Sequence, residues 1–200
     1  MKLRGGKRLA TTVMILLGAA TCGFGQHADV ASPRASDLNG RQAQPLLDRK
    51  ARAVVLFFVE TNCPISNRYA PEIIRLYGKF TSAGVTFWLI YPDSDDEPQA
   101  IRSHLKDYDY KLGALRDVRQ ELVKTAGASV TPEAAIFVPS AKGPQMVYRG
   151  RIDDRFVSFG KTRPAPTSRD VEQVLAAIVA GKSVVTTTTI ALGCAIADMK

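Results

Sequence analysis

Apolar side chains recur with two different spacings along residues 53–180, and each spacing predicts a kind of element. Residues 53–59 and 85–91 are apolar runs rich in branched and aromatic side chains, a composition typical of strands buried on both faces. Between them the apolar positions have helical spacing over residues 65–80, at Ile73, Ile74, Leu76, Tyr77 and Phe80. Strand, helix and strand in this order predict a parallel pair of strands.

The rest of the chain predicts three more helices and a hairpin. The helices are expected at residues 97–108, from after Asp117 to 126, and at 170–180. Strands at 134–138 and 147–152 flank a Lys-Gly-Pro turn and form the hairpin. A short hairpin around Asn39-Gly40 is expected before the core begins. The fold class is therefore α/β, with a central mixed β-sheet flanked by helices.

The N-terminus has the layout of a secretory signal peptide. An apolar run at residues 9–20 and small residues up to Gly25 follow four basic side chains, Lys2, Arg4, Lys7 and Arg8. Cleavage is expected after Gly25, and cleavage after Ala20 also fits. No later apolar stretch approaches the roughly 20 residues of a transmembrane helix. We therefore expect an exported protein, periplasmic or extracellular, that does not span the membrane.

A lipid anchor is the alternative to free export. It would make Cys22 the modified N-terminus, but Thr21 is a poor residue before such a cysteine and Ala19 replaces the usual leucine. The expected organisation is a signal peptide at 1–25, a disordered leader at 26–36, one domain at 37–182 and a tail at 183–200 that contains Cys194.

Charge and cysteine count narrow the chemistry. The formal net charge is +8, of which four positive charges belong to the signal, and the remaining basic residues are mixed with acidic ones. This distribution argues against nucleic acid as a partner. Because Cys22 leaves with the signal, Cys63 and Cys194 are the thiols of the mature protein, and two thiols can form one bridge in an oxidising compartment.

Cys63 is the strongest candidate for chemistry because it lies where a buried strand turns into a helix. A thiol there faces unpaired backbone N–H groups and the positive end of the helix dipole, and both favour the nucleophilic thiolate. The alternatives are a small apolar residue or one half of a structural bridge.

Four segments carry a resemblance to a known family. They are TNCPISNRYAPE (61–72), TPE (131–133), RGRIDDR (149–155) and GCAI (193–196). Together with the order of elements over residues 37–180, they resemble the redoxin group of the thioredoxin superfamily, the peroxiredoxin-like branch named after alkyl hydroperoxide reductase and thiol-specific antioxidant proteins. The resemblance implies a thioredoxin-like fold and thiol-disulfide oxidoreductase or peroxiredoxin-like antioxidant activity. The implied partners are protein or small-molecule thiols, disulfides and peroxides, and we expect neither a cofactor nor a metal.

The resemblance also assigns roles to residues. Cys63 is the redox-active thiol, and Thr131 precedes Pro132, which is cis in this superfamily and faces the cysteine. A cis X–Pro bond lets the backbone before it pair with an extended substrate. Disulfide reductases of this fold have a second cysteine where this chain has Ser66, so a disulfide must involve Cys194, a partner protein or a small thiol. Cys194 is then a resolving cysteine, a static staple or a free thiol.

Glu60 departs from the peroxiredoxin pattern. Peroxiredoxins usually carry a threonine three residues before the reactive cysteine, whereas this chain has Glu60 there and Thr61 one residue later. A carboxylate that pointed inward would oppose formation of the thiolate. The chain turns before Cys63, so strand alternation leaves the direction of this side chain open.

Other polar residues near these motifs have a catalytic and a structural interpretation. Three arginines are candidates for a cation near the thiolate, or else are surface residues that pair with Asp153 and Asp154; they are Arg149, Arg151 and Arg155.

Structural roles are expected for four residues close to the motifs. Ser66 and Asp117 would cap helices. Tyr69 and Glu72 would be packing and surface residues.

Two other functions stay open. Sco-type copper metallochaperones share the fold and use two cysteines four apart with a distant histidine. This chain has Asn67 in the fourth position, and no histidine follows His104, expected on a surface helix, so a copper site would lack most of its ligands. A redox-inert binding module would also fit the missing second cysteine and the Glu60 departure.

Overall fold

The computed structural model describes residues 1–2 and 32–197. The expected signal peptide and Cys22 lie outside the described residues, as does most of the expected leader. The first strand, β1, begins at Ala35, before the expected start of the domain, and the Ala35 side chain is buried in the core.

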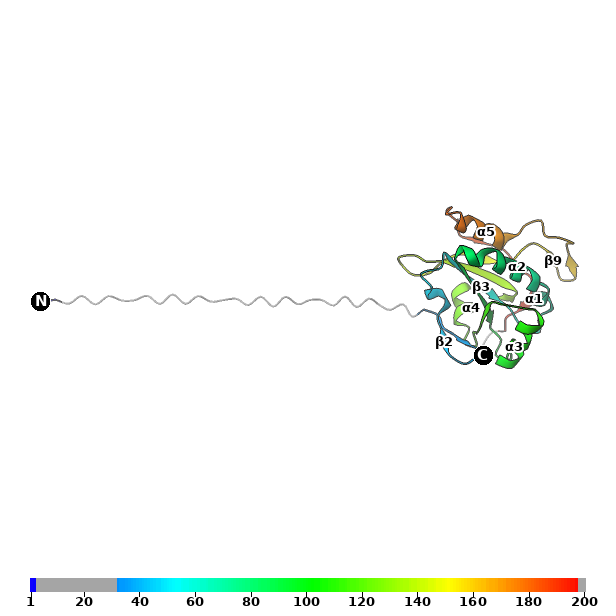
Figure 1. The fold of residues 1–200 in the computed structure, drawn as a ribbon, viewed down its shortest axis with the longest axis horizontal. Coiled ribbons are helices and arrows are strands. Elements are labelled where there is room, and N and C mark those ends of the chain that lie inside the picture. The colour runs from blue at the N-terminus through cyan, green and yellow to red at the C-terminus, as the bar shows by residue number, and fades with distance from the viewer. Residues whose placement is uncertain (3–31, 198–200) are drawn as a thin grey trace. The chain divides into compact units, whose positions relative to one another are not determined.

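A mixed β-sheet forms the centre of the fold (Figure 1). Its strand order is β11-β8-β7-β3-β4-β5-β1-β2. The bounds are β1 Ala35–Asp37, β2 Gln42–Ala43, β3 Ala53–Phe58, β4 Val85–Tyr91, β5 Gly113–Arg116, β7 Glu133–Val138, β8 Gln145–Gly150 and β11 Thr187–Thr188. Parallel and antiparallel pairs are both present, which confirms the expected α/β class with a mixed sheet.

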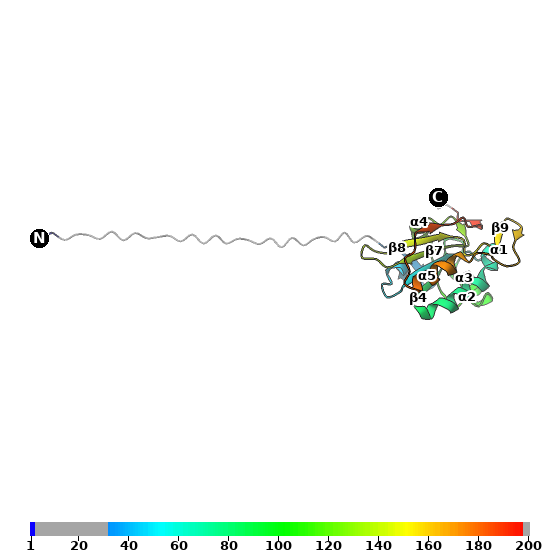
Figure 2. The same cartoon turned by 90° about the horizontal axis from the view of Figure 1, so that it is seen from above.

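Helices cover both faces of this sheet. They are α1 Pro64–Arg68, α2 Ala70–Phe80, α3 Pro98–Asp107, α4 Glu121–Ala126 and α5 Asp170–Val179, with 3-10 turns at Pro45–Leu47 and Thr81–Ala83. Alternate side chains of β3 join two separate hydrophobic clusters, one with α2, α3 and α5 and the other with α4. Figure 2 shows α4 on the opposite side of the sheet from α2, α3 and α5. In the part of the chain that the structure describes, no helix has the length and apolarity needed to cross a membrane.

Strand β3 is the axis of the sheet. All six of its side chains are buried, as the continuous apolar run predicts. It pairs in parallel with β4, with Phe58 opposite Ile90, and antiparallel with β7, with Phe58 opposite Glu133. The end of β3 therefore lies beside the beginning of β7, and the loops that follow the one and precede the other are neighbours.

The helix expected over residues 65–80 is two helices. It breaks at Tyr69, whose amide bonds the carbonyl of Ser66 at 3.0 Å in a tighter turn. Pro71 has no N–H to continue the helical ladder, and the Tyr69 hydroxyl is fixed by Asp153 at 2.8 Å. The break separates α2 from the short helix α1, which begins immediately after Cys63.

The third helix, expected directly after Asp117, begins at Glu121. Before it, residues 113–116 form strand β5, which the sequence pattern does not predict because the strand is short and only Leu115 is fully buried. Asp117 still acts as a cap, since its carboxylate accepts the amides of Glu121 and Val123 at 2.9 Å each.

Two small sheets complete the described part of the chain. One is a hairpin of β9 Phe156–Ser158 and β10 Lys161–Thr162. The other pairs β6 Val130–Thr131 with β12 Cys194–Ala195. The tail, which has no sequence periodicity, is thus docked on the domain through β11 and β12.

Adjacent isoleucines on α2 test how the helix is held. Ile73 is fully buried in the larger cluster, whereas Ile74 is only partly buried. Ile73→Ala should lower the free energy of unfolding by ~3 kcal/mol because it leaves a cavity, and Ile74→Ala should cost less than half as much. Urea titration of the two oxidised proteins measures the difference, and equal losses would contradict the packing.

Candidate active site

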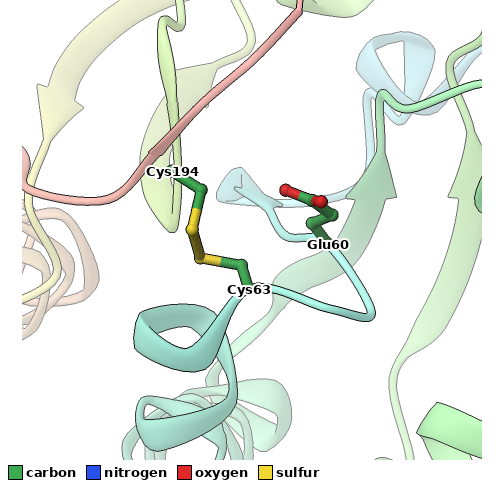
Figure 3. Close-up of side chains that lie close together, drawn as sticks. All are labelled: Glu60, Cys63 and Cys194. Atoms are coloured by element: carbon green, nitrogen blue, oxygen red, sulfur yellow. A yellow bond between two sulfur atoms is a disulfide. The ribbon is translucent and has the colours of Figure 1, made fainter.

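A disulfide between Cys63 and Cys194 is the centre of the site (Figure 3). The two residues are 131 positions apart in the sequence, and their Cα atoms are 6.1 Å apart. Of the roles left open for Cys194, the bond is compatible with both a resolving cysteine and a static staple.

Cys63 occupies the turn from β3 into α1. It has extended backbone angles, φ −79° and ψ 112°, and is the residue immediately before the first turn of α1. Its carbonyl accepts the amide of Asn67 at 3.0 Å. Only 1% of its surface is exposed, whereas Cys194 is partly exposed. An incoming thiol therefore reaches the bond more readily from the side of Cys194.

The loop before β7 forms the opposite wall. The Thr131–Pro132 peptide bond is cis, as the resemblance implies, and the carbonyl oxygen of Thr131 lies 3.0 Å from the Cys63 sulfur. That sulfur has no proton while the disulfide is intact, but a reduced thiol in the same place can donate to the carbonyl.

Glu60 points toward the two sulfurs (Figure 3). A carboxylate oxygen and the sulfurs of Cys63 and Cys194 all lie within 4.8 Å of one another, and the Thr131 hydroxyl donates to the carboxylate at 3.3 Å. Burial raises the pKa of Glu60, as does the nearby charge of Asp96. These three side chains could share a metal ion only after reduction, because the sulfurs are bonded to each other in this structure.

A hydrogen-bonded chain of side chains braces the loop of Cys63 from behind. The Asn67 amide donates to the carbonyl of Thr61 at 3.0 Å, and the Asn67 oxygen and His104 Nε2 are 2.8 Å apart. His104 Nδ1 is 2.8 Å from the Tyr91 hydroxyl, and the Thr61 hydroxyl bonds Asp96. The loop is therefore tied both to β4 and to α3.

His104 is buried, so the expectation that it lies on a surface helix is wrong. It is 5% exposed, and burial lowers its pKa. Helix α3 turns this side chain inward because Tyr91 and Asn67 satisfy both of its ring nitrogens. The sequence signal that could have found the contact is its place among the aromatic residues Tyr108 and Tyr110, which pack on the imidazole.

Two further structural expectations near Cys63 are corrected. Glu72 is buried, not on the surface, because its carboxylate binds both Arg75 and Arg169 at 2.7 Å. Ser66 does not cap a helix: its side chain is buried, and the described residues provide no hydrogen-bond partner for its hydroxyl.

Of the three candidate arginines, Arg149 and Arg151 bind other carboxylates, whereas Arg155 contacts Asp153 through its backbone amide, at 2.9 Å. Arg149 lies 3.8 Å from Glu133, and Arg151 binds Asp170 at 2.9 Å. Neither pairs with the expected Asp153 or Asp154, whose carboxylates accept backbone amides and hydroxyl groups as well as Arg163. The charged side chain that lies with the two sulfurs is thus the acidic Glu60.

The match to a known family decides the classification. The model of the AhpC/TSA family matches residues 28–145. The chain belongs to the AhpC/TSA family. Membership confirms the redoxin resemblance. The matched range contains Glu60, Cys63 and Pro132, and with them the segments at 61–72 and 131–133, but not the segments at 149–155 and 193–196.

Relatives of this AhpC/TSA protein include thiol oxidoreductases. The thiol-disulfide oxidoreductase ResA of Bacillus thuringiensis subsp. konkukian is 30% identical over 107 residues, which are 54% of this chain and 60% of ResA. The chain thus matches less than two thirds of that relative.

Solved structures confirm the thioredoxin-like fold. An uncharacterized conserved protein from Geobacillus kaustophilus has a TM-score of 0.69 at 24% identity, covering 82% of this chain and 88% of the other. A secreted Mycobacterium tuberculosis disulfide oxidoreductase, homologous to E. coli DsbE, has a TM-score of 0.50 at 19% identity, covering 75% and 96%.

Removing the charge of Glu60 should make Cys63 more reactive. In the reduced protein a carboxylate beside the sulfur repels a thiolate, so Glu60→Gln should speed alkylation of Cys63 by iodoacetamide about three- to tenfold at pH 7. The gain should shrink as the pH falls through the raised pKa of Glu60, where the wild-type carboxyl group becomes neutral. Rates measured by mass spectrometry of the Cys63 peptide test both effects.

Glu97→Gln is the matched control, because it removes the same charge from an exposed side chain at the start of α3. It should leave the alkylation rate unchanged. Equal rates in wild type and Glu60→Gln across the pH range would show that the carboxylate does not act on the sulfur.

Proposed function

We propose that this protein is a thiol-disulfide oxidoreductase in which Cys63 and Cys194 form the redox pair. The observation that carries the proposal is the disulfide itself, which joins the turn at the start of α1 to a tail paired beside Pro132. The activity named for ResA and for the Mycobacterium tuberculosis protein supports it.

The reaction needs only the two cysteines and an external dithiol or disulfide. In the reduced protein the Cys63 thiolate attacks one sulfur of a substrate disulfide, a mixed disulfide forms and one substrate thiolate leaves. The Cys194 thiolate then attacks the Cys63 sulfur, so the second substrate thiolate leaves and the Cys63–Cys194 bond forms. The substrate disulfide gains two electrons, the protein dithiol loses them, and an external dithiol reverses the change in the protein.

The surroundings of Cys63 act in opposite directions on the stability of its thiolate, which is both the nucleophile and the leaving group of the exchange. Backbone N–H groups at the start of α1 favour the thiolate, while burial and the carboxylate of Glu60 oppose it. A carboxylate in the place where peroxiredoxins usually carry threonine favours disulfide exchange over peroxide reduction as the main activity.

Separate serine variants distinguish a redox pair from a static staple. Cys63→Ser should abolish reduction of a disulfide substrate, because the attacking sulfur is lost. Cys194→Ser should still complete the first step and then accumulate the mixed disulfide at Cys63, since the resolving sulfur is absent. Intact-mass spectrometry after mixing the reduced variants with oxidised glutathione measures both outcomes.

The rate at which hydrogen peroxide oxidises the reduced wild-type protein, compared with the rate for disulfides, tests which class of substrate the protein prefers. Loss of turnover with no mixed disulfide in Cys194→Ser would make the bond a static staple. Faster oxidation by peroxide than by disulfides would make peroxide reduction the principal activity.

Export is the second part of the proposal, and it rests on the four basic residues and the short apolar run that follows them. Expression of the full chain in a bacterium with an intact secretion pathway should give a mature N-terminus between Thr21 and Ala28. N-terminal peptide mapping of the periplasmic fraction checks it. Retained Met1 in a cytoplasmic protein would contradict export, and a lipid on Cys22 would contradict only free release.

A further inference from the structure

The tail of the chain is seated on a strand edge beside Cys63. Strand β12 pairs antiparallel with β6, so that Cys194 lies opposite Thr131 and Ala195 lies opposite Val130. Among the described strands, β6 has no other partner in its small sheet. The tail therefore occupies the paired edge of β6 in this oxidised state.

Main-chain groups continue the contact beyond the two-residue strand. The backbone amide of Ile196 donates to the carbonyl of Ser129 at 3.0 Å, and the side-chain amide of Gln120 donates to the backbone carbonyl of Ala197 at 2.7 Å. Bonds of this kind recognise an extended backbone and carry no information about its side chains. A segment of another protein can make the same bonds.

Two positions near the tail cysteine limit which side chains the edge can accept: Gly193, immediately before Cys194, and Ile196, two residues after it. Gly193 is buried, and a Cβ added there would collide with the carbonyl of Thr131 and lie 3.1 Å from the nitrogen of Pro132. On the other side, Ile196 packs against the cluster that contains Leu122. Ala195 between them is exposed, so that position accepts any side chain.

The resemblance already implies that an extended substrate pairs with the backbone before Pro132. We propose that residues 193–196 of this chain are a built-in mimic of the cysteine-containing substrate segment, that they compete with it for the edge of β6, and that their sequence shows which segments the edge prefers. The preferred segment has glycine immediately before its cysteine and an apolar residue two positions after it. This inference rests on the proposed function, because it names the substrate class of the same thiol.

Reduction is the event that opens the edge. Once the bond is broken, the tail is held near Cys63 by a few main-chain bonds and the partly buried Ile196, while most of residues 182–192 are exposed. The tail then competes with the substrate segment for one edge, and its return with Cys194 displaces the product after each turnover.

Matched peptides test the preference on the full chain with Cys22→Ser and Cys194→Ser, which keeps the tail, cannot close the bond and leaves Cys63 as its one thiol. The peptides are IALGCAIA, which copies residues 190–197, and the variants IALVCAIA and IALGCADA, each with its cysteine in a disulfide with thionitrobenzoate. The Cys63 thiolate attacks the peptide sulfur, the Cys63–peptide disulfide forms, and coloured thionitrobenzoate leaves with the electron pair of the broken bond.

The copied peptide should react at least about tenfold faster than either variant peptide, because valine collides with Thr131 and aspartate loses the apolar contact. The same glycine has the opposite effect within the protein. Adding Gly193→Val to Cys194→Ser should weaken the tail's own docking, free the edge and speed the reaction with IALGCAIA several-fold.

The symmetric disulfide of thionitrobenzoate distinguishes failure of the proposed function from failure of the peptide-binding edge. It reports the reactivity of Cys63 without binding the edge of β6. No reaction with this small disulfide would refute the proposed function itself. A normal reaction with it, combined with equal rates for the three peptides or with no acceleration by Gly193→Val, would refute the peptide edge while leaving the oxidoreductase intact.

Discussion

The antiparallel pairing of β7 with β3 is the constraint on which the site depends. Phe58, the last residue of β3, lies opposite Glu133, the first residue of β7. Two loops far apart in the sequence are therefore brought together, one ending in Cys63 and the other in the cis Thr131–Pro132 bond. A shift of one residue in this register would also reverse which side chains of β3 face each hydrophobic cluster. The same register therefore determines both the packing of the core and the geometry of the candidate site.

The parts of the fold that the sequence predicts well are those where a repeated pattern and burial agree. Strands β3 and β4 are continuous apolar runs, and the apolar face of α2 has helical spacing, so their existence and near bounds could be inferred. Strand β5 could not, because it has four residues of which only Leu115 is fully buried, and so short a segment carries no clear period. The break at Tyr69 depends on Asp153, which is distant in the sequence, and local patterns do not contain such contacts.

The candidate site divides in the same way. Cys63 and Pro132 belong to local motifs and were identifiable, whereas the direction of Glu60 and the burial of His104 depend on how β4 and α3 pack behind the loop. The structure also changes the electrostatic description of the site. Burial raises the pKa of both Glu60 and Asp96, and Arg149 and Arg151 bind other carboxylates. These two arginines therefore do not offset the carboxylate beside Cys63, whereas the backbone N–H groups at the start of α1 favour a thiolate there.

The long separation between the bonded cysteines has a consequence for biosynthesis. The residues between them include most of the strands of the central sheet and every described α-helix. During synthesis Cys63 therefore cannot form this disulfide until the intervening chain has been made, because Cys194 is added 131 residues later. Since domains generally fold as units, the folded sheet can bring Cys194 to Cys63 and so select the correct pairing. Oxidation then follows folding of the domain.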